Sequence, residues 1–307
     1  MMRPLDTLRV VFMGTPDYAV PTLKVLCDQT LVVGVVSQPA RPKGRGNQIE
    51  QTPVGAFAEA RGIALFQWPR LSNQSYQALQ ALAPDLIVVV AYGRILPQRY
   101  LDLPPLGCIN GHGSLLPALR GAAPIQWAVI HGLEETGVSI MKMDAGMDTG
   151  PVALTRRLPI GPEETAASVF ERMSVLTAEA VVEYLENPRP FVDQDPTGAT
   201  HARPLTKEDG LLDWSWSAAT VHNRVRGTWP WPGAYFPRDG QPWKVHATRV
   251  IEGHGEPGTI TGHAPDGPIV ACGEGAVVLT RLQKPGRNVL DGKTFLLGEP
   301  LPPGTRL

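Results

Sequence analysis

The chain has 307 residues, of which 43% are hydrophobic and 19% charged; it is long enough for two domains, and its composition excludes a disordered chain. Its formal net charge of −1 excludes the strong basic field that many dedicated nucleic-acid binders carry. The three cysteines are far apart in the sequence and form neither a disulfide framework nor a metal-ligand spacing, so we expect a reducing compartment and no bound metal.

Nothing in the sequence is typical of a membrane span or of an export signal. No apolar run approaches the roughly 20 residues that span a bilayer. The N-terminal segment MMRPLDTLRVVFMG has no long apolar core after its single arginine, which is not typical of a signal peptide. We therefore expect a cytoplasmic protein with no membrane partner.

Residues 1–188 alternate between short apolar runs and helical patterns. The runs at 8–13, 31–36 and 85–92 are rich in β-branched residues and predict strands that are buried on both faces. Helices are predicted from Thr52-Pro53, where a capping residue precedes a proline at the first helical position, and over 72–83 and 163–186. This alternation predicts an α/β domain with a mostly parallel, Rossmann-like sheet.

The pattern changes after the third helix. Residues 189–205 are proline-rich and show little periodicity, which predicts a linker. Residues 206–307 then contain short alternating segments such as WKVHATRVI and AVVLTRLQ, separated by glycine and proline. We interpret them as a small C-terminal β-barrel of the OB-like kind.

Two segments carry groups suited to chemistry. The first strand ends in GTPDYA instead of G-x-G-x-x-G, which argues against a dinucleotide site. In NGHGSLLPALRG, Asn110 and His112 are two residues apart, so on a strand they share a face, where an amide and an imidazole could stabilise an oxyanion in acyl transfer. Asp148, in MDAGMDTG, is the candidate acid. Taken alone, each of the three is more often an ordinary turn or cap residue, so their spacing by itself is weak evidence.

Several motifs, in the same order and at similar spacing, resemble the methionyl-tRNA formyltransferase family of folate-dependent formyltransferases. They are GTPDYA, SQPARPKGRG, AYGRILP, NGHGSLLPALRG and MDAGMDTG in the first domain, and VRGTWPWPGAY and FLLGEPLPPGTRL in the second. The resemblance implies formyl transfer from 10-formyltetrahydrofolate to the α-amine of initiator methionyl-tRNA, and it places Asn110, His112 and Asp148 on the catalytic positions.

The same resemblance implies two binding segments. The residues matched to tetrahydrofolate binding are Ser114, Leu115, Leu116 and Pro117, together with Arg94, Ile95 and Leu96 at the pterin edge. The basic loop of residues 38–52 would reach the tRNA acceptor arm through Arg41, Lys43 and Arg45, and residues 206–307 would form a tRNA-binding domain. Trp229 and Trp231 could stack on RNA, but we expect them to be buried aromatic residues of the barrel. We also expect a monomer.

Three other functions stay open at this point. The chain could formylate an amino sugar or another amine, or it could hydrolyse 10-formyltetrahydrofolate with water as acceptor. It could also be an RNA-binding protein whose folate site has decayed, although the presence of Asn110, His112 and Asp148 argues against that reading.

Overall fold

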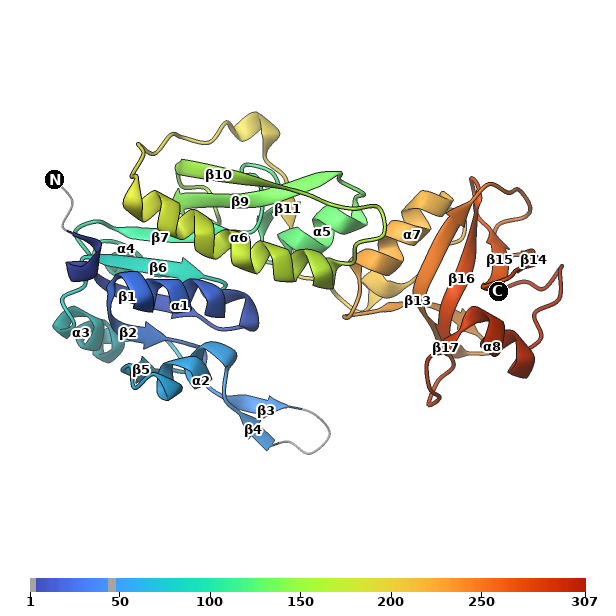
Figure 1. Ribbon diagram of the computed structural model, residues 1–307, viewed down its shortest axis with the longest axis horizontal. Coiled ribbons are helices and arrows are strands. Elements are labelled where there is room, and N and C mark those ends of the chain that lie inside the picture. The colour runs from blue at the N-terminus through green and yellow to red at the C-terminus, as the bar shows by residue number, and fades with distance from the viewer. Residues whose placement is uncertain (1–3, 44–47) are drawn as a thin grey trace. The chain divides into compact units, whose positions relative to one another are not determined.

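The computed structural model describes residues 4–43 and 48–307, which fold into two compact units (Figure 1). The first unit comprises Met1–Pro124, Thr136–Pro159 and Phe170–Ala202. The second comprises Ile125–Glu135, Ile160–Val169 and Arg203–Leu307. The units are therefore interleaved along the sequence, because two short segments that precede residue 170 pack with the C-terminal residues.

The first unit is built on a seven-stranded sheet with the order β10-β9-β7-β6-β1-β2-β5. Its strands are β1 (Arg9–Gly14), β2 (Leu31–Val36), β5 (Leu65–Phe66), β6 (Leu86–Val90), β7 (Cys108–His112), β9 (Glu135–Lys142) and β10 (Val152–Pro159). The pairs from β5 to β7 are parallel, and β9 is antiparallel to β7. Strands β1 and β6 are buried almost throughout, as their unbroken apolar runs predict.

Helices cover this sheet (Figure 1). They are α1 (Val20–Gln29), α2 (Pro53–Ala60), α3 (Asn73–Ala81), α4 (Gln98–Leu101) and the long α6 (Ala166–Glu186). The α2 cap is as predicted, since the Thr52 hydroxyl accepts from the backbone N–H of Gly55. Helix α6 begins three residues later than the pattern predicts, because Thr165 and Ser168 exchange side-chain and backbone hydrogen bonds that cap the helix there.

Two small strand pairs complete the first unit. Strands β3 (Arg41–Lys43) and β4 (Gln48–Glu50) pair antiparallel after β2. Strand β8 (Arg120–Gly121) pairs in parallel with β11 (His201–Ala202), which lies about 80 residues further along the chain. The segment that we predicted as a linker therefore contributes a strand to the first unit.

The second unit contains an antiparallel sheet with the order β12-β13-β16-β15-β14. Its elements are β12 (Ala234–Arg238), β13 (Gln241–Ile251), β14 (Ile260–Ala264), β15 (Gly267–Ala271), β16 (Ala276–Gln283), β17 (Leu290–Asp291), α5 (Pro124–Ile130), α7 (Ala218–Gly227) and α8 (Gly292–Gly298). Its core includes Trp214, Val221, Phe236, Trp243 and Phe295. The prediction of a mostly parallel α/β domain followed by a small β domain is confirmed.

Candidate active site

The two predicted oxyanion donors lie at the end of β7. Asn110 pairs with Val89 of β6 and Met141 of β9, and His112 pairs with Ser139 of β9. The residue between them, Gly111, turns toward α6, where a Cβ atom would lie 2.7 Å from the Cγ2 atom of Thr177. Alternation along the strand then places Asn110 and His112 together on the opposite face, as the sequence predicts. The Asn110 amide makes no hydrogen bond to any residue that the structure describes.

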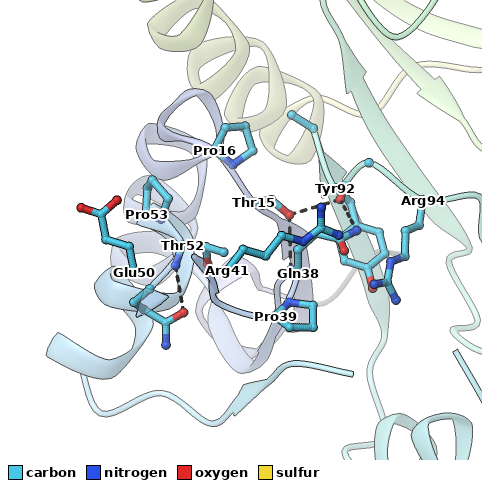
Figure 2. Close-up of a pocket in the computed structure, with 13 residues that line it drawn as sticks. Thr15, Pro16, Gln38, Pro39, Arg41, Glu50, Thr52, Pro53, Tyr92 and Arg94 are labelled. Atoms are coloured by element: carbon cyan, nitrogen blue, oxygen red, sulfur yellow. Dashed lines mark hydrogen bonds between the residues drawn. The ribbon is translucent and has the colours of Figure 1, made fainter. Parts of the chain in front are cut away.

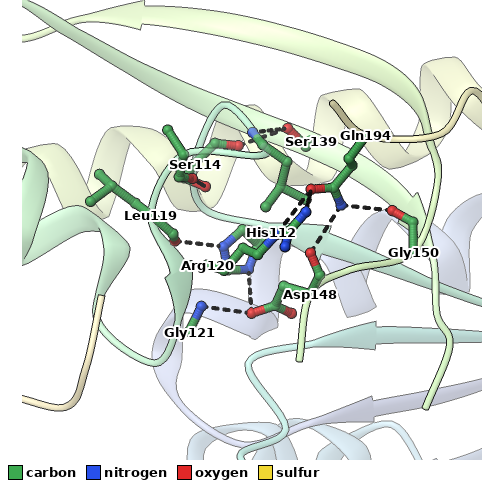
Figure 3. A network of polar contacts seen from close by, with 11 residues as sticks. His112, Ser114, Leu119, Arg120, Gly121, Ser139, Asp148, Gly150 and Gln194 are labelled. Carbon is green, nitrogen blue, oxygen red and sulfur yellow. Dashed lines mark hydrogen bonds and ion pairs between the residues drawn. The ribbon is translucent and has the colours of Figure 1, made fainter. Parts of the chain in front are cut away.

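The imidazole ring of His112 is held between two oxygen atoms (Figure 3). Its Nε2 atom lies 3.1 Å from the carbonyl oxygen of Leu119, and its Nδ1 atom lies 3.7 Å from Oδ2 of Asp148. A carbonyl oxygen can only accept, so Nε2 carries a hydrogen. The Nδ1 atom is turned toward a carboxylate but is too far away for a direct hydrogen bond, which leaves that side of the ring able to bind another group.

Asp148 lies in the exposed loop between β9 and β10 and has a φ of 55°, which is unusual for a residue other than glycine. Its Oδ2 atom accepts a hydrogen bond of 2.8 Å from the backbone N–H of Gly121. Gly121 has a φ of 116°, and a Cβ atom there would lie 2.7 Å from the carbonyl oxygen of Ala202. Only glycine fits this position, because a side chain would collide with the backbone of Ala202 in the paired strand β11. The N–H that orients the Asp148 carboxylate therefore belongs to a glycine that this strand pair requires.

The segment from Ser114 to Pro117 follows directly after β7. The Ser114 hydroxyl donates to the carbonyl oxygen of Ala118 over 2.6 Å, and the Ser139 hydroxyl bridges Ser114 and Leu116. Ser114 is 1% exposed, whereas Leu115, Leu116 and Pro117 are half-buried. The serine therefore holds the turn together, and the next three residues are the ones that a ligand can reach.

The second predicted folate segment follows β6. Strand β6 ends at Val90 because Ala91 and Gly93 have φ values of 46° and 78°, which turn the chain out of the sheet. Ile95 is 71% exposed, while Leu96 is 2% exposed and belongs to the core. The Arg94 guanidinium donates to the carbonyl oxygen of Trp68. The segment thus exposes the apolar side chain of Ile95 and is anchored by Arg94 and by the buried Leu96.

A pocket of about 510 Å³ opens beside this segment, at the ends of β1, β2 and β6 (Figure 2). Its lining includes Thr15, Gln38, Arg41, Tyr92 and Arg94. The Thr15 hydroxyl and the Gln38 amide both donate to the carbonyl oxygen of Tyr92, which fixes the floor of the pocket. The other end of the Gln38 amide, Oε1, is buried and has no hydrogen-bond partner among the described residues. Open α/β sheets bind their ligands at this edge.

The predicted tRNA residues and the two tryptophans have different outcomes. Arg41 is exposed on β3 and lines the pocket, Lys43 ends the same strand, and Arg45 lies outside the described residues. In the second unit, Trp229 and Trp231 are 36% and 56% exposed, so the expectation that they are buried is wrong and neither is a core residue. The part of the chain that the structure describes has no helix long and apolar enough to cross a membrane.

Comparison with known proteins decides the family. The formyl transferase family model matches residues 8–185, and the model for the formyl transferase C-terminal domain matches residues 204–300. Methionyl-tRNA formyltransferase of Geobacter sulfurreducens is 46% identical over 306 residues, which cover 98% of this chain and 96% of that protein. The enzyme of Myxococcus xanthus is 45% identical over 311 residues, covering 100% of this chain and 98% of that one.

The chain belongs to the methionyl-tRNA formyltransferase family. The fold agrees with this assignment. The solved methionyl-tRNA formyltransferase from Clostridium thermocellum matches with a TM-score of 0.56 and 15% identity, covering 80% of this chain and 94% of that one. An N-formyltransferase from Helicobacter canadensis, solved with folinic acid and dTDP-3-aminofucose, matches with a TM-score of 0.66 and 14% identity, covering 89% and 99%.

The cysteines of this family member are poor nucleophiles. Cys108 lies on β7, two residues before Asn110, and burial raises the pKa of its thiol to about 12. Burial likewise raises the pKa of Cys272 to about 11 and that of Cys27 above its ordinary value. A thiol must ionise to attack a carbonyl carbon. Direct transfer between substrates is therefore favoured over a covalent intermediate on cysteine.

Sequence reasoning missed three residues that hold the site. Leu119 fixes the His112 ring through its carbonyl oxygen, and Thr200 accepts a hydrogen bond of 2.8 Å from the backbone N–H of Leu119. Gln194 donates to the backbone carbonyl oxygens of Asp148 and Gly150 (Figure 3). Two of these three lie in the proline-rich segment 189–205, whose lack of periodicity gave no sign of a structural role.

Proposed function

We propose that this chain transfers the formyl group of 10-formyltetrahydrofolate to the α-amine of methionine on initiator tRNA. The observation that carries the proposal is the arrangement at β7: the half-buried amide of Asn110 shares a strand face with the imidazole of His112, whose Nδ1 atom faces Asp148 at 3.7 Å. Membership of the methionyl-tRNA formyltransferase family over nearly the whole chain supports the choice of substrates.

The proposed reaction begins when the amine nitrogen attacks the formyl carbon and the carbonyl electron pair moves to oxygen. The Asn110 N–H and the His112 Nδ1–H donate hydrogen bonds to this oxyanion, while the Leu119 carbonyl keeps the ring in place. Asp148 stabilises the charged ring and relays the proton from the attacking nitrogen to the folate N10 atom. The oxyanion then re-forms its double bond and breaks the bond between carbon and N10.

The donor would lie along the two segments that flank this centre. The half-buried Leu115, Leu116 and Pro117 would form one wall and the exposed Ile95 would form the other, while Arg94 anchors the loop of Ile95. A flat pterin ring is mostly apolar on its faces, so covering Ile95 would remove an exposed hydrophobic side chain from water. Ser114 and the buried Leu96 would act by holding these walls and not by contacting the ring.

The acceptor end of the tRNA would enter through the pocket between β1, β2 and β6. The basic side chains of Arg41, Lys43 and Arg45 would contact phosphates, and the Oε1 atom of Gln38 would accept from a ribose or amino group. Residues 206–307, including the exposed Trp229 and Trp231, would give further RNA contacts. The three free thiols support a cytoplasmic protein, and we propose that it acts as a monomer.

The test is a competition of acceptors. Donor labelled in its formyl group is incubated with the protein and with methionyl initiator tRNA, a nucleotide-linked amino sugar, or water alone. We expect label to transfer to the tRNA at a kcat/KM at least about a hundredfold above that for the sugar. Transfer to the sugar alone, or release as formate alone, would replace this proposal with one of the two enzymatic alternatives. Tight tRNA binding without any transfer would support a decayed enzyme.

A further inference from the structure

Gln194 lies in the segment between α6 and the second unit, and both ends of its amide are fully used (Figure 3). Its Nε2 atom donates to the carbonyl oxygens of Asp148 and Gly150, over 2.9 and 2.7 Å. Its Oε1 atom accepts from Nε and a terminal nitrogen of Arg120, over 3.1 and 2.7 Å. Carbonyl oxygens only accept and a guanidinium only donates, so the amide can sit in only one orientation.

Two of these four bonds end on the turn that presents Asp148. The residues around it, from Asp144 to Met147 and Thr149, are mostly exposed, yet Asp148 has a positive φ of 55° and a side chain that is only 17% exposed. A non-glycine residue keeps such a conformation only where its surroundings enforce it. Gln194 binds the carbonyl oxygens of Asp148 and of the second residue after it, which fixes the peptide groups that follow the Asp148 Cα atom.

Arg120 connects this clamp to the other side of the site. It is the residue before Gly121, whose backbone N–H orients the Asp148 carboxylate, and it directly follows Leu119, whose carbonyl oxygen holds His112. Gln194 thereby couples the backbone of the loop that carries Asp148 to residues 119–121, which contact both the Asp148 carboxylate and the His112 ring.

We infer that Gln194 is a positioning residue for the transfer reaction, which sets the distance between Asp148 and His112 by clamping the Asp148 loop to Arg120. The inference deepens the proposed function and rests on it. Gln194 touches neither reacting group through its own side chain, so its effect must pass through the orientation of Asp148.

The variant that tests this is Gln194→Glu, because it keeps the size of the side chain and strengthens its bond to Arg120. The carboxylate cannot donate, and it would repel the carbonyl oxygens of Asp148 and Gly150. We expect kcat to fall by at least about tenfold, since small misplacements of a catalytic group are costly, while KM for the folate donor stays within about twofold. The control is Asp195→Ala, which removes bonds only to Thr197 in the same exposed turn and should leave kcat unchanged.

A double-mutant cycle separates positioning from a general structural role. If Gln194 acts through Asp148, then Gln194→Glu should lower the activity of Asp148→Asn by less than about twofold. An equal loss in both backgrounds would overturn the inference, and so would wild-type kcat in Gln194→Glu. A wild-type protein that fails to formylate tRNA would instead contradict the proposed function. In that case a crystal structure of Gln194→Glu still tests the inference, which requires that Asp148 lose its positive φ and its hydrogen bond from the backbone N–H of Gly121.

Discussion

Two buried histidines, one in each unit, have nearly the same surroundings. The His112 side chain is 7% exposed, with a backbone carbonyl at 3.1 Å and a carboxylate oxygen at 3.7 Å. The His222 side chain is 10% exposed, with the carbonyl oxygen of Pro162 at 3.1 Å and a carboxylate oxygen of Glu163 at 3.8 Å. Burial, the carbonyl contact and the ion-pair distance do not distinguish a candidate catalytic residue from a structural one.

The second ring nitrogen does distinguish them. His222 Nδ1 lies 2.9 Å from the hydroxyl of Thr248, so both of its nitrogens have a hydrogen-bond partner. Its carboxylate neighbour, Glu163, is 73% exposed, whereas Asp148 is 17% exposed and is itself held by Gly121. Both ring nitrogens of His222 are therefore hydrogen-bonded within the protein, whereas the Nδ1 atom of His112 has no hydrogen-bond partner among the described residues. Incomplete hydrogen bonding in a well-held side chain distinguishes the candidate catalytic histidine from the structural one.

Removing the unsatisfied histidine should have the largest effect on catalysis. We expect His112→Ala to lower kcat by about two to three powers of ten, the usual cost of losing an oxyanion donor. Asn110→Ala should lower it by a similar factor, since it removes the other donor. Single-turnover formylation of methionyl-tRNA at saturating donor measures both. Near-normal turnover of His112→Ala, with donor binding intact, would contradict the mechanism and remove the distinction between the two histidines.

The matched variant in the second unit, His222→Ala, should lower the stability of the fold and leave kcat unchanged. His222→Ala deprives the Thr248 hydroxyl and the Pro162 carbonyl of a partner, and it should lower the free energy of unfolding by about 1–3 kcal/mol. Urea unfolding followed by fluorescence of the second unit's tryptophans measures this decrease. If folded His222→Ala protein has a kcat more than about fivefold below wild type, then a histidine with both ring nitrogens hydrogen-bonded within the protein is not necessarily a structural one.

The carboxylate of Asp209, in the second unit, accepts more hydrogen bonds than that of Asp148. Asp209 accepts from both terminal nitrogens of Arg203 and from the backbone and hydroxyl of Thr206. These hydrogen bonds lower the pKa of Asp209 from 3.8 to about 2, and the hydrogen bond from Arg203 contributes most. A carboxyl group whose pKa is lower in the folded than in the unfolded protein stabilises the fold at pH values above the unfolded-state pKa. This contribution is lost as the pH falls through the folded-state pKa.

Asp209→Asn should therefore reduce the free energy of unfolding by about 1–2 kcal/mol at pH 7, an amount discounted for the exposed guanidinium of Arg203. The difference from wild type should shrink as pH falls from about 4 to about 2, where Asp209 becomes protonated. Urea titrations at about pH 7, 4 and 3 test this. A difference that stays constant over that range would mean that the ion pair is not the source, and kcat at neutral pH should not change.

Much of the site could be predicted because its parts are local in sequence. Strand alternation predicted that Asn110 and His112 share one face. The capping side chain of Thr52 and the proline that follows it predicted the start of α2. The apolar run at 85–92 was predicted too long, because nothing in the residue type of Ala91 signals its positive φ. Local pattern predicts which elements form, and tertiary contacts decide where they end.

The supports of the site could not be predicted, because they join distant parts of the chain. Gln194 meets Asp148 across 46 residues, and Thr200 meets Leu119 across 81. A glutamine in a proline-rich segment is typical of a solvated linker, and no periodicity distinguishes one that clamps a loop. The uneven division of the chain into two units has the same cause: residues 125–135 join the second unit by packing and not by sequence order.

The smallest effect should come from the edge of the pocket, where the cation would meet a phosphate only when RNA is bound. Arg41 is exposed on β3 and lines the pocket, so Arg41→Ala should raise KM for charged tRNA severalfold and leave KM for the folate donor unchanged. Removing one phosphate-binding cation should also flatten the slope of log affinity against log salt by about one charge. The control is Arg189→Ala in the first unit, outside the proposed RNA-binding residues, where the guanidinium is already paired with Glu183 at 2.8 Å. If the two variants and the wild type share one slope, Arg41 is an ordinary surface residue and the tRNA is bound elsewhere.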